Sequence, residues 1–197
     1  MNTSWHSYPS IYALGHNALG ELLLDDVLVE EKVDGSQFSF GVFIENDEPV
    51  FRCRSKGQII VPDAPEKMFQ QAVDAARALP LNPGWTYRAE YLAKPKHNVL
   101  AYDRTPEKHL IIFDINDGEE AYLGYDAKAT EAQRLGLEVV PRLHEGRINA
   151  LETVMGFLDR ESILGGKKIE GFVIKNYKRF GRDKKVLMGK FVSAEFK

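Results

Sequence analysis

Lys32 has the residue type and the setting of a nucleophile that forms a covalent intermediate. It stands in EEKVDGSQF, directly after Glu31 and shortly before Asp34-Gly35. A lysine amine is a poor nucleophile at its ordinary pKa of about 10.4, so a catalytic lysine needs neighbouring cations or desolvation that favour its neutral form. At a strand end beside a turn, the amine can reach into a groove. A lone lysine before Asp-Gly is more often an ordinary hairpin residue, so its role depends on the rest of the chain.

Residues 167–190 concentrate positive charge in a chain whose net charge is −3. The segment KKIEGFVIKNYKRFGRDKKVLMGK holds nine Lys or Arg against Glu170 and Asp183, a local balance of +7, so the remainder sums to −10. Such a concentration favours a polyanionic ligand, with phosphate the commonest candidate. The alternative is a solvated edge strand that its charges protect from pairing.

The elements that must position these residues are strands. Apolar residues alternate from Phe38 to Ile44 in SQFSFGVFI, which is the period of a half-buried strand. Together with VLVEEKV before it, this segment predicts a hairpin that turns at Asp34-Gly35. Further strands are predicted for PVFRCRS, WTYRAEYL, HLIIFDI, LEVVPRL, IEGFVIKNY and KVLMGKFVS.

Helices are predicted between some of these strands. Asp63 and Pro65 open the first, and apolar residues recur at helical spacing at Met68, Phe69, Ala72, Val73, Ala76 and Leu79. Two more fit residues 126–135 and 148–160. The pattern predicts an α+β fold dominated by antiparallel sheet, with helices packed outside.

Composition restricts the class of protein. The chain has 197 residues, of which 44% are apolar and 28% charged, close to a soluble globular average. It shows neither a membrane-spanning run nor a signal peptide, so a cytoplasmic protein without a membrane partner is expected. Cys53 is the single cysteine, which excludes an intramolecular disulfide and a cysteine-rich zinc site.

Several short motifs follow Lys32 in order. After KVDGS come RCRSKG, YRAE, IIFDI, EGFVIK and a strand ending in LMGKF. The series resembles the motifs of the covalent nucleotidyltransferase superfamily of ligases and capping enzymes, and in particular the ATP-dependent RNA ligase family related to phage T4 RNA ligase 2. The resemblance implies a single ATP-grasp-like adenylyltransferase domain over residues 1–197, without the C-terminal RNA-binding domain that relatives generally carry.

The resemblance implies roles for the matching residues. Lys32 attacks the α-phosphate of ATP, expels pyrophosphate and holds AMP as a phosphoramidate. Glu31 approaches the adenine, Glu90 accepts a hydrogen bond from a ribose hydroxyl, and Phe113 stacks on the adenine face. Glu170 binds or orients Mg²⁺ or Mn²⁺. Outside the motif series, Phe113 would be interpreted as a residue of the apolar core. Glu90 would be interpreted as the partner of a nearby arginine in a surface ion pair.

Cations complete the implied site. Arg54 lies near the ribose and phosphate, with Lys56 as the alternative because the register of RCRSKG is ambiguous, and Lys175 and Lys190 neutralise the AMP phosphate. These clustered cations lower the pKa of Lys32. Glu170 and Lys175 are five residues apart, so either a bulge intervenes or one of them acts from the strand end.

The implied activity is sealing of RNA. AMP passes from the lysine to an RNA 5′-phosphate, and a 3′-hydroxyl then displaces it. Gln37 favours RNA, because DNA ligases of this pattern usually have arginine there. Met188 replaces an expected lysine, for which Lys184 or Lys185 is a substitute. The alternatives are a DNA ligase, a GTP-using capping enzyme, and a non-catalytic nucleotide- or RNA-binding module.

Overall fold

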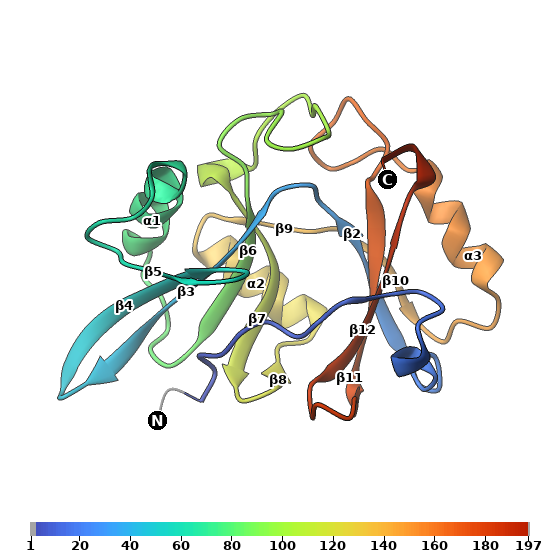
Figure 1. Ribbon diagram of the computed structural model, residues 1–197, viewed down its shortest axis with the longest axis horizontal. Helices are drawn as coiled ribbons and strands as arrows, with labels where there is room; N and C mark the ends of the chain where they lie inside the picture. Colours follow the sequence, from blue (N-terminus) through green and yellow to red (C-terminus); the bar gives the residue numbers. More distant parts are fainter. Residues whose placement is uncertain (1–2, 197) are drawn as a thin grey trace. The chain divides into compact units, whose positions relative to one another are not determined.

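The structure is a computed structural model that describes residues 3–196, and its chain divides into two compact units (Figure 1). The first unit comprises the described residues of Met1–Tyr8, Gly35–His97 and Arg104–Val139. The second comprises those of Pro9–Asp34, Asn98–Asp103 and Val140–Lys197. Each unit is assembled from three separated segments, which explains why no linker is visible in the sequence.

The first unit contains a largely antiparallel sheet. Its strands in spatial order are β5 (Ile59–Ile60), β4 (Glu48–Ser55), β3 (Ser36–Glu45), β6 (Thr86–Tyr91), β7 (Leu110–Gly118) and β8 (Ala121–Tyr122). The short β9 (Glu138–Val139) pairs with β7 in parallel. Asn46 and Asp47 turn the β3–β4 hairpin with positive φ angles, which suits the right-handed twist of the two strands.

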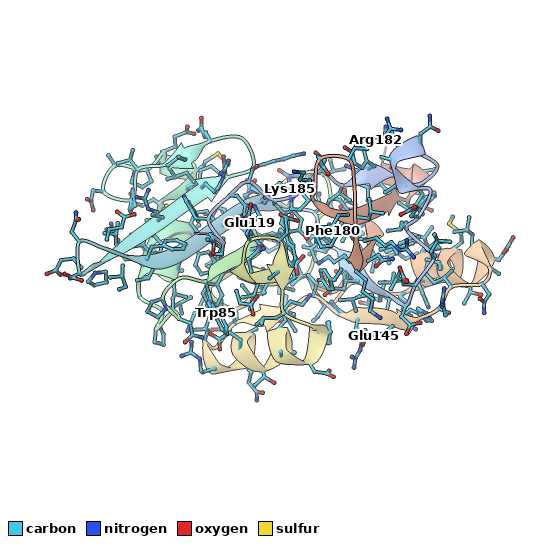
Figure 2. The ribbon with its side chains drawn as sticks, turned by 90° about the horizontal axis from the view of Figure 1, so that it is seen from below. Trp85, Glu119, Glu145, Phe180, Arg182 and Lys185 are labelled. Carbon is cyan, nitrogen blue, oxygen red and sulfur yellow. The ribbon has the colours of Figure 1, made fainter. Side chains whose placement is uncertain are left out.

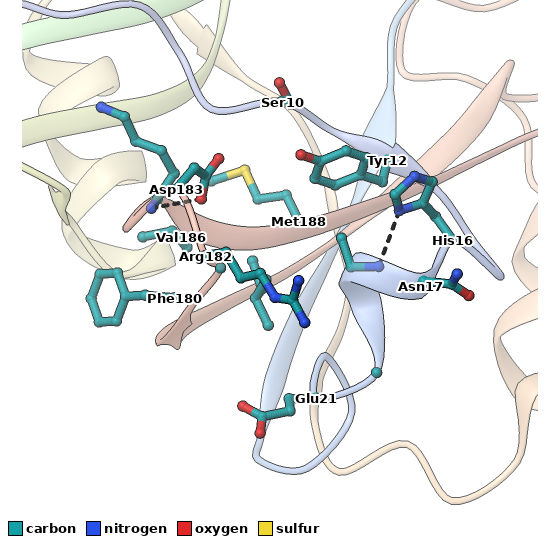
Figure 3. Close-up of a pocket in the computed structure, with 15 residues that line it drawn as sticks. Ser10, Tyr12, His16, Asn17, Glu21, Phe180, Arg182, Asp183, Val186 and Met188 are labelled. Carbon is teal, nitrogen blue, oxygen red and sulfur yellow. Dashed lines mark hydrogen bonds between the residues drawn. The ribbon is translucent and has the colours of Figure 1, made fainter.

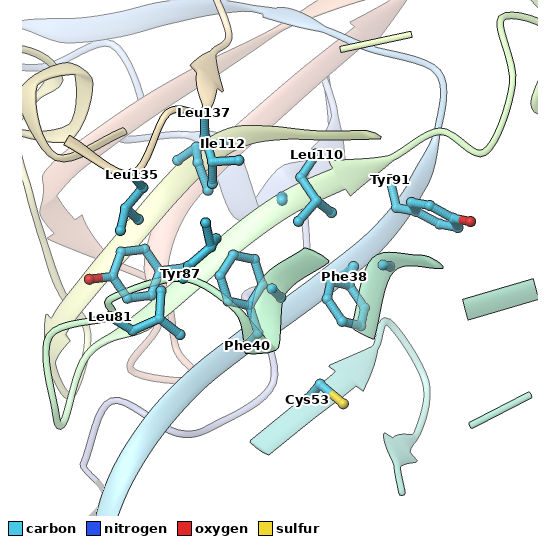
Figure 4. Close-up of a cluster of buried hydrophobic side chains, with 14 of the residues drawn as sticks. Phe38, Phe40, Cys53, Leu81, Tyr87, Tyr91, Leu110, Ile112, Leu135 and Leu137 are labelled. Carbon is cyan, nitrogen blue, oxygen red and sulfur yellow. The ribbon is translucent and has the colours of Figure 1, made fainter. Parts of the chain in front are cut away.

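One face of this sheet carries the core of the unit. The strand predicted for WTYRAEYL is confirmed as β6, and its alternate residues Tyr87, Ala89 and Tyr91 all join that core. Phe40 stacks on Tyr87 with ring centroids 5.5 Å apart, and Phe38 lies beside Phe40 (Figure 4). Burial of such aromatic side chains is a main source of stability in a domain of this size.

Helices cover the unit near that core. They are η2 (Lys67–Phe69), α1 (Gln70–Arg77), η3 (Glu107–His109) and α2 (Tyr125–Arg134). The helix expected to open at Asp63 begins only at Lys67, since Ala64 N–H bonds the Val61 carbonyl in a turn instead. Met68 was predicted on the buried face, but its side chain is 49% exposed because the first turn is a 3-10 helix.

The second unit contains a five-stranded sheet. Its strands in spatial order are β1 (Tyr12–Ala13), β12 (Val186–Val192), β11 (Gly171–Phe180), β2 (Val27–Lys32) and β10 (Arg142–Gly146). Only the β1–β12 pair among them is parallel. The unit also holds η1 (Asn17–Leu19), α3 (Leu151–Met155), η4 (Gly156–Asp159) and η5 (Ala194–Phe196). The predicted α+β class is confirmed.

Alternate residues of this sheet build the second core. Val29 of β2, Phe172 and Ile174 of β11 and Leu187 of β12 bury one face against apolar residues of η1 and α3. The opposite face presents Lys32, Lys175 and Lys190, because side chains alternate along each strand. The described chain contains no helix with the length and apolar character that a membrane crossing requires.

Two strand predictions were wrong in their pairing. Asp34-Gly35 does not turn a hairpin, since β2 pairs with β10 and β11 whereas β3 pairs with β4 and β6. LEVVPRL is not one strand, because the segment divides at Val140-Pro141 into β9 and β10, which belong to different sheets. Proline has no N–H for a ladder, and here its carbonyl accepts a bond from Glu31 N–H.

Candidate active site

Lys32 and Glu170 form the centre of the site in the second unit. Lys32 ends β2 and lies opposite Gly171, the first residue of β11, so strand pairing brings Glu170 beside it. Lys32 Nζ donates to Glu170 Oε2 at 2.6 Å, and the two side chains are 26% and 13% exposed. Glu170 therefore lies at the strand end, and β11 has no bulge between Gly171 and Lys175.

Gly171 is required by the closeness of the neighbouring strand. A Cβ atom at this position would lie 1.9 Å from the Phe191 carbonyl oxygen of β12. No side chain fits at that distance, so the Glu-Gly sequence at the start of EGFVIK has a structural reason. The glycine lets β11 and β12 approach while Glu170 stays at the open end.

Asp34 holds the backbone that follows Lys32. Its carboxylate accepts bonds from Val99 N–H at 2.9 Å and Leu100 N–H at 2.8 Å, and Asn98 Nδ2 lies 3.3 Å away. Asp34 N–H in turn donates to the Tyr102 hydroxyl at 2.8 Å. The aspartate was interpreted only as a turn residue. Its partners lie more than 60 residues away, so no local pattern pointed to this role.

Glu31 points away from Lys32 because the two are neighbours on one strand. Its buried carboxylate accepts a hydrogen bond from Ser162 Oγ and another from Ile163 N–H at 3.1 Å. Burial raises the pKa of Glu31, while these two hydrogen bonds act in the opposite direction. The contacts tie β2 to the loop before β11.

Lys175 and Lys190 share the sheet face that carries Lys32. Lys175 Nζ lies 2.7 Å from Glu30 Oε1 in a pair whose side chains are 2% and 1% exposed. A buried pair of this kind holds its geometry firmly, since removal of either partner leaves an uncompensated charge. Lys190 of β12 lies opposite Val173 of β11, and its side chain is half-buried.

Met188 takes the place of the missing cation. It is fully buried and lies directly opposite Lys175 in the β11–β12 ladder. Lys184 and Lys185, named as substitutes, stand in the turn before β12 begins at Val186. Neither therefore shares the strand position of Met188.

The first unit carries the other expected residues on its polar sheet face. Arg54 of β4 lies opposite Ser39, which lies opposite Arg88 of β6, and Glu90 lies one step further along that face. Arg54 and Glu90 are half-buried, whereas Lys56 follows the strand and is exposed. Strand pairing thus places Arg54, not Lys56, on the face that also presents Glu90.

Arg88 is a fully buried cation that fixes this face. Its guanidinium donates to Ser39 Oγ at 3.1 Å, to Asn116 Oδ1 at 3.1 Å and to the His6 carbonyl at 2.8 Å. Burial lowers its pKa, and the nearby Asp114 is among the groups that oppose the shift. The sequence offered Arg88 only as a surface partner for Glu90, because alternation does not reveal which polar face is covered.

Phe113 sits on a β-bulge. Arg88 pairs with Asp114 and Ala89 with Ile112, so Phe113 is the extra residue on β7. Its carbonyl accepts a bond from the buried Lys128 Nζ of α2 at 3.0 Å. A bulge turns a side chain out of the strand alternation, so Phe113 is half-buried rather than part of the apolar core.

The Phe113 ring packs against another aromatic ring. Tyr8 meets it edge to face with ring centroids 5.0 Å apart, and the Tyr8 hydroxyl donates a hydrogen bond to Asp114.

Sequence reasoning missed the role of Lys128 in holding the Phe113 carbonyl, because a lysine within a helix is normally solvated.

The donor set fits a hydrated divalent cation at Glu170. Only Oε2 of this carboxylate has a partner in the described structure, which leaves Oε1 open. Mg²⁺ usually takes one or two carboxylates and completes its shell with water and phosphate oxygens. Between residues 3 and 196 no three His, Cys, Asp or Glu side chains gather as a metal-binding cluster.

Comparison with known proteins gives a family match over most of the chain. The family model described as RNA ligase matches residues 25–192. Among curated proteins none matches the chain. Among solved structures, Naegleria gruberi RNA ligase with PPi gives a TM-score of 0.65 at 18% identity, covering 97% of this chain and 57% of that one.

Two further structures of the Naegleria gruberi enzyme agree. A mutant with ATP and Mn gives a TM-score of 0.64 at 18% identity, over 97% of this chain and 57% of that one. A mutant with AMP and Mn gives 0.62 at 18% identity, over 96% and 56%. The present chain therefore shares their fold and spans just over half of their length.

Proposed function

The chain belongs to the RNA ligase family, as its motif series predicts, and from this premise we propose that it is an ATP-dependent RNA ligase or the adenylation domain of one. The observation that carries the proposal is the contact of Lys32 Nζ with Glu170 Oε2 at 2.6 Å. The pairing of β2 with β11 brings together the residues that KVDG and EGFVIK contribute. An ordinary hairpin lysine has no need of such a partner.

The first proposed step is transfer of AMP to Lys32. The neutral amine attacks the α-phosphorus, a P–N bond forms, and the bond from that phosphorus to the bridging oxygen breaks, so that pyrophosphate leaves with the electron pair. Glu170 Oε2 is positioned to take the proton that the ammonium must lose. Such reactions depend mainly on positioning and charge neutralisation.

Two further steps complete the proposed reaction. An oxygen of an RNA 5′-phosphate attacks the phosphoramidate and releases the lysine, which gives an RNA end capped by AMP through a pyrophosphate bond. An RNA 3′-hydroxyl then attacks that 5′-phosphate, forms the phosphodiester and expels AMP. The proton of the hydroxyl leaves with solvent or with a carboxylate.

The remaining residues enter the proposal as nucleotide ligands. Lys175 and Lys190 face the phosphate. Glu31 approaches the adenine together with the loop before β11, which its carboxylate holds. Arg54 binds near the ribose and phosphate, with Lys56 as its alternative. Glu90 accepts a hydrogen bond from a ribose hydroxyl, and Phe113 stacks on the base. Glu170 Oε1 would hold Mg²⁺ or Mn²⁺, which supplies charge neutralisation at the phosphates when bound.

Intact mass spectrometry tests the covalent step. After incubation with ATP and Mg²⁺ or Mn²⁺, we expect wild-type protein to gain the mass of one AMP and Lys32→Ala to gain none. Lys167→Ala serves as the matched control, since Lys167 is an exposed lysine of the basic segment without a carboxylate partner in the described chain. Adduct formation on Lys32→Ala would refute the assignment of the nucleophile.

A module that binds nucleotide without transferring it is the second candidate, and Met188 favours it. This buried thioether stands opposite Lys175 where a cation is expected, which weakens phosphate neutralisation. Reversible ATP binding without an adduct would support this candidate. Labelling with GTP in place of ATP, or sealing of nicked DNA in preference to nicked RNA, would point to the capping-enzyme or DNA-ligase alternative.

A further inference from the structure

Six of the nine cations in the basic segment 167–190 differ in whether they have a carboxylate partner. Three have carboxylate partners: Lys168 with Asp159, Lys175 with Glu30, and Arg179 with Asp25 and Glu21. By contrast, Lys178, Arg182 and Lys184 at the end of the β11–β12 hairpin have no ion pair within the described residues. The proposed AMP site uses none of these three, so their charge requires another explanation.

A groove lies beside this hairpin end. It has a volume of about 790 Å³ and is lined by parts of Ser10–Glu21 and of Phe180–Met188. Figure 3 shows the Arg182 side chain extending from the hairpin toward the segment that carries Asn17 and Glu21. All of its lining residues belong to the second unit.

Three aromatic rings line the groove together with Arg182, namely those of Tyr12, His16 and Phe180. Tyr12 and His16 stack at a centroid distance of 4.5 Å and an interplanar angle of 18°. Phe180 is 51% exposed, and Figure 2 shows it on the hairpin with Arg182 and Lys185. Phe180 and Arg182 both line the groove, and Figure 3 shows their side chains extending from the hairpin in different directions. An exposed aromatic ring and a guanidinium on one groove suit a ligand that has both flat faces and negative charge.

The acidic residues of the groove are already engaged. Glu21 lies 3.4 Å from the Arg179 guanidinium, and Asp183 Oδ1 accepts the Lys185 N–H at 3.0 Å. Neither carboxylate forms an ion pair with Arg182 within the described residues, so its guanidinium can contact an incoming anion. The groove also shares β12 with Lys190, since Met188 lines it two residues away.

We propose that this groove binds a single-stranded segment of the RNA substrate, with Arg182 on a backbone phosphate and Phe180 stacked on a base. Proteins hold single strands by aromatic platforms along a cationic path, and sequence-specific hydrogen bonds are not required. The inference rests on the proposed function, because it names a contact surface for the polynucleotide of that reaction. ATP and AMP are not ligands of this groove.

Fluorescence anisotropy with a labelled single-stranded RNA oligonucleotide tests the proposal. Phe180→Ala should weaken binding about five-fold or more, the worth of one stacked base. Arg182→Ala should also weaken binding, and it should reduce the slope of log affinity against log salt by about 0.7, as expected for one lost phosphate contact to a single strand. Phe180→Ala should leave that slope unchanged. Both side chains are exposed, so unchanged melting temperatures are expected.

Two matched controls make the test specific. Lys167→Ala removes a partner-free cation of the same basic segment outside the groove, and Leu151→Ala removes an apolar side chain that is 50% exposed on α3. Both should bind RNA like wild type. Equal losses in Lys167→Ala and Arg182→Ala, or unchanged binding in Phe180→Ala, would overturn the proposal. So would variants that lose binding to vesicles of anionic phospholipid while keeping RNA affinity.

The two proposals fail separately. AMP labelling of wild-type protein by ATP needs no RNA, so its absence would refute the proposed function while groove mutants still reported on RNA binding. Normal labelling with no effect of Phe180→Ala on RNA affinity would instead refute only the groove.

Discussion

Asp34 links the backbone beside Lys32, the proposed nucleophile, to a distant segment through a single carboxylate. Val99 and Leu100 both donate their N–H groups to Asp34 Oδ2, at 2.9 and 2.8 Å. Leu100 is buried, so its N–H has no access to water as a substitute partner. The position of Lys32 therefore depends on a residue that need not touch the nucleotide.

We expect Asp34→Ala to reduce both stability and activity. The unpaired N–H groups should lower the free energy of unfolding by about 1–3 kcal/mol. Displacement of the Lys32 backbone should slow AMP labelling by about 10²-fold, since small misplacements of a reacting group are that costly. Urea unfolding and the time course of labelling measure the two effects. Asp34→Asn keeps one acceptor oxygen, and a labelling rate in that variant lower than in Asp34→Ala would contradict this account.

Glu31 should make stability depend on pH. Burial raises its pKa, so the unfolded chain loses the proton at a lower pH than the folded protein does. The folded state then binds more protons across that interval, and stability falls as the pH rises from the ordinary glutamate value through the raised one.

Thermal melts of wild type and Glu31→Gln at several pH values measure this contribution. The amide oxygen of the variant can still accept from Ile163 N–H, and the variant carries no charge to desolvate. We expect its melting temperature relative to wild type to improve as the pH rises above about 4. A difference that is constant with pH would show that Glu31 does not titrate in this way.

The β-bulge in β7 makes the position of Phe113 depend on helix α2. Lys128 donates to the Phe113 carbonyl at 3.0 Å, and its Nζ lies 5.3 Å from the Tyr125 ring centroid. The helix thus holds a strand residue through its main chain, and a shift of that main chain would move the aromatic ring with it. We regard Lys128 as a positioning residue.

Lys128→Met should therefore raise the KM for ATP in the labelling reaction by about two- to ten-fold, the worth of an aromatic contact. The maximal labelling rate should change less, because Lys32 and Glu170 are untouched. Phe113→Ala provides the reference and should show the same direction. A loss confined to the maximal rate, with KM unchanged, would argue against a positioning role.

The sequence predicted which segments form strands, but it did not predict which strands pair with one another. The sequence identified the strand β6 correctly, and Tyr87, Ala89 and Tyr91 share the face of that strand that joins the apolar core. It failed at Asp34-Gly35, because turn chemistry does not reveal that β2 and β3 join different sheets. It could not place the bulge at Phe113 either, since an extra residue on one strand is visible only against its partner.

In the whole molecule, ordered motifs were more informative than composition. Lys32 and Glu170 are 138 residues apart, and only the motif order suggested that they meet, as the structure shows. The net charge of −3 gave no sign of the basic hairpin end. Roles that depend on buried polar partners, such as those of Arg88 and Lys128, required the folded structure, because a sequence does not show which charges lose contact with water.

The division of each unit into three separated segments also restricts how the gene can be rearranged. The first unit begins before the second and ends at Val139, while the second extends from Pro9 to the last segment. A recombination breakpoint anywhere between codons 9 and 139 therefore splits both units at once. No single crossover within that stretch can therefore transfer one unit whole without the other.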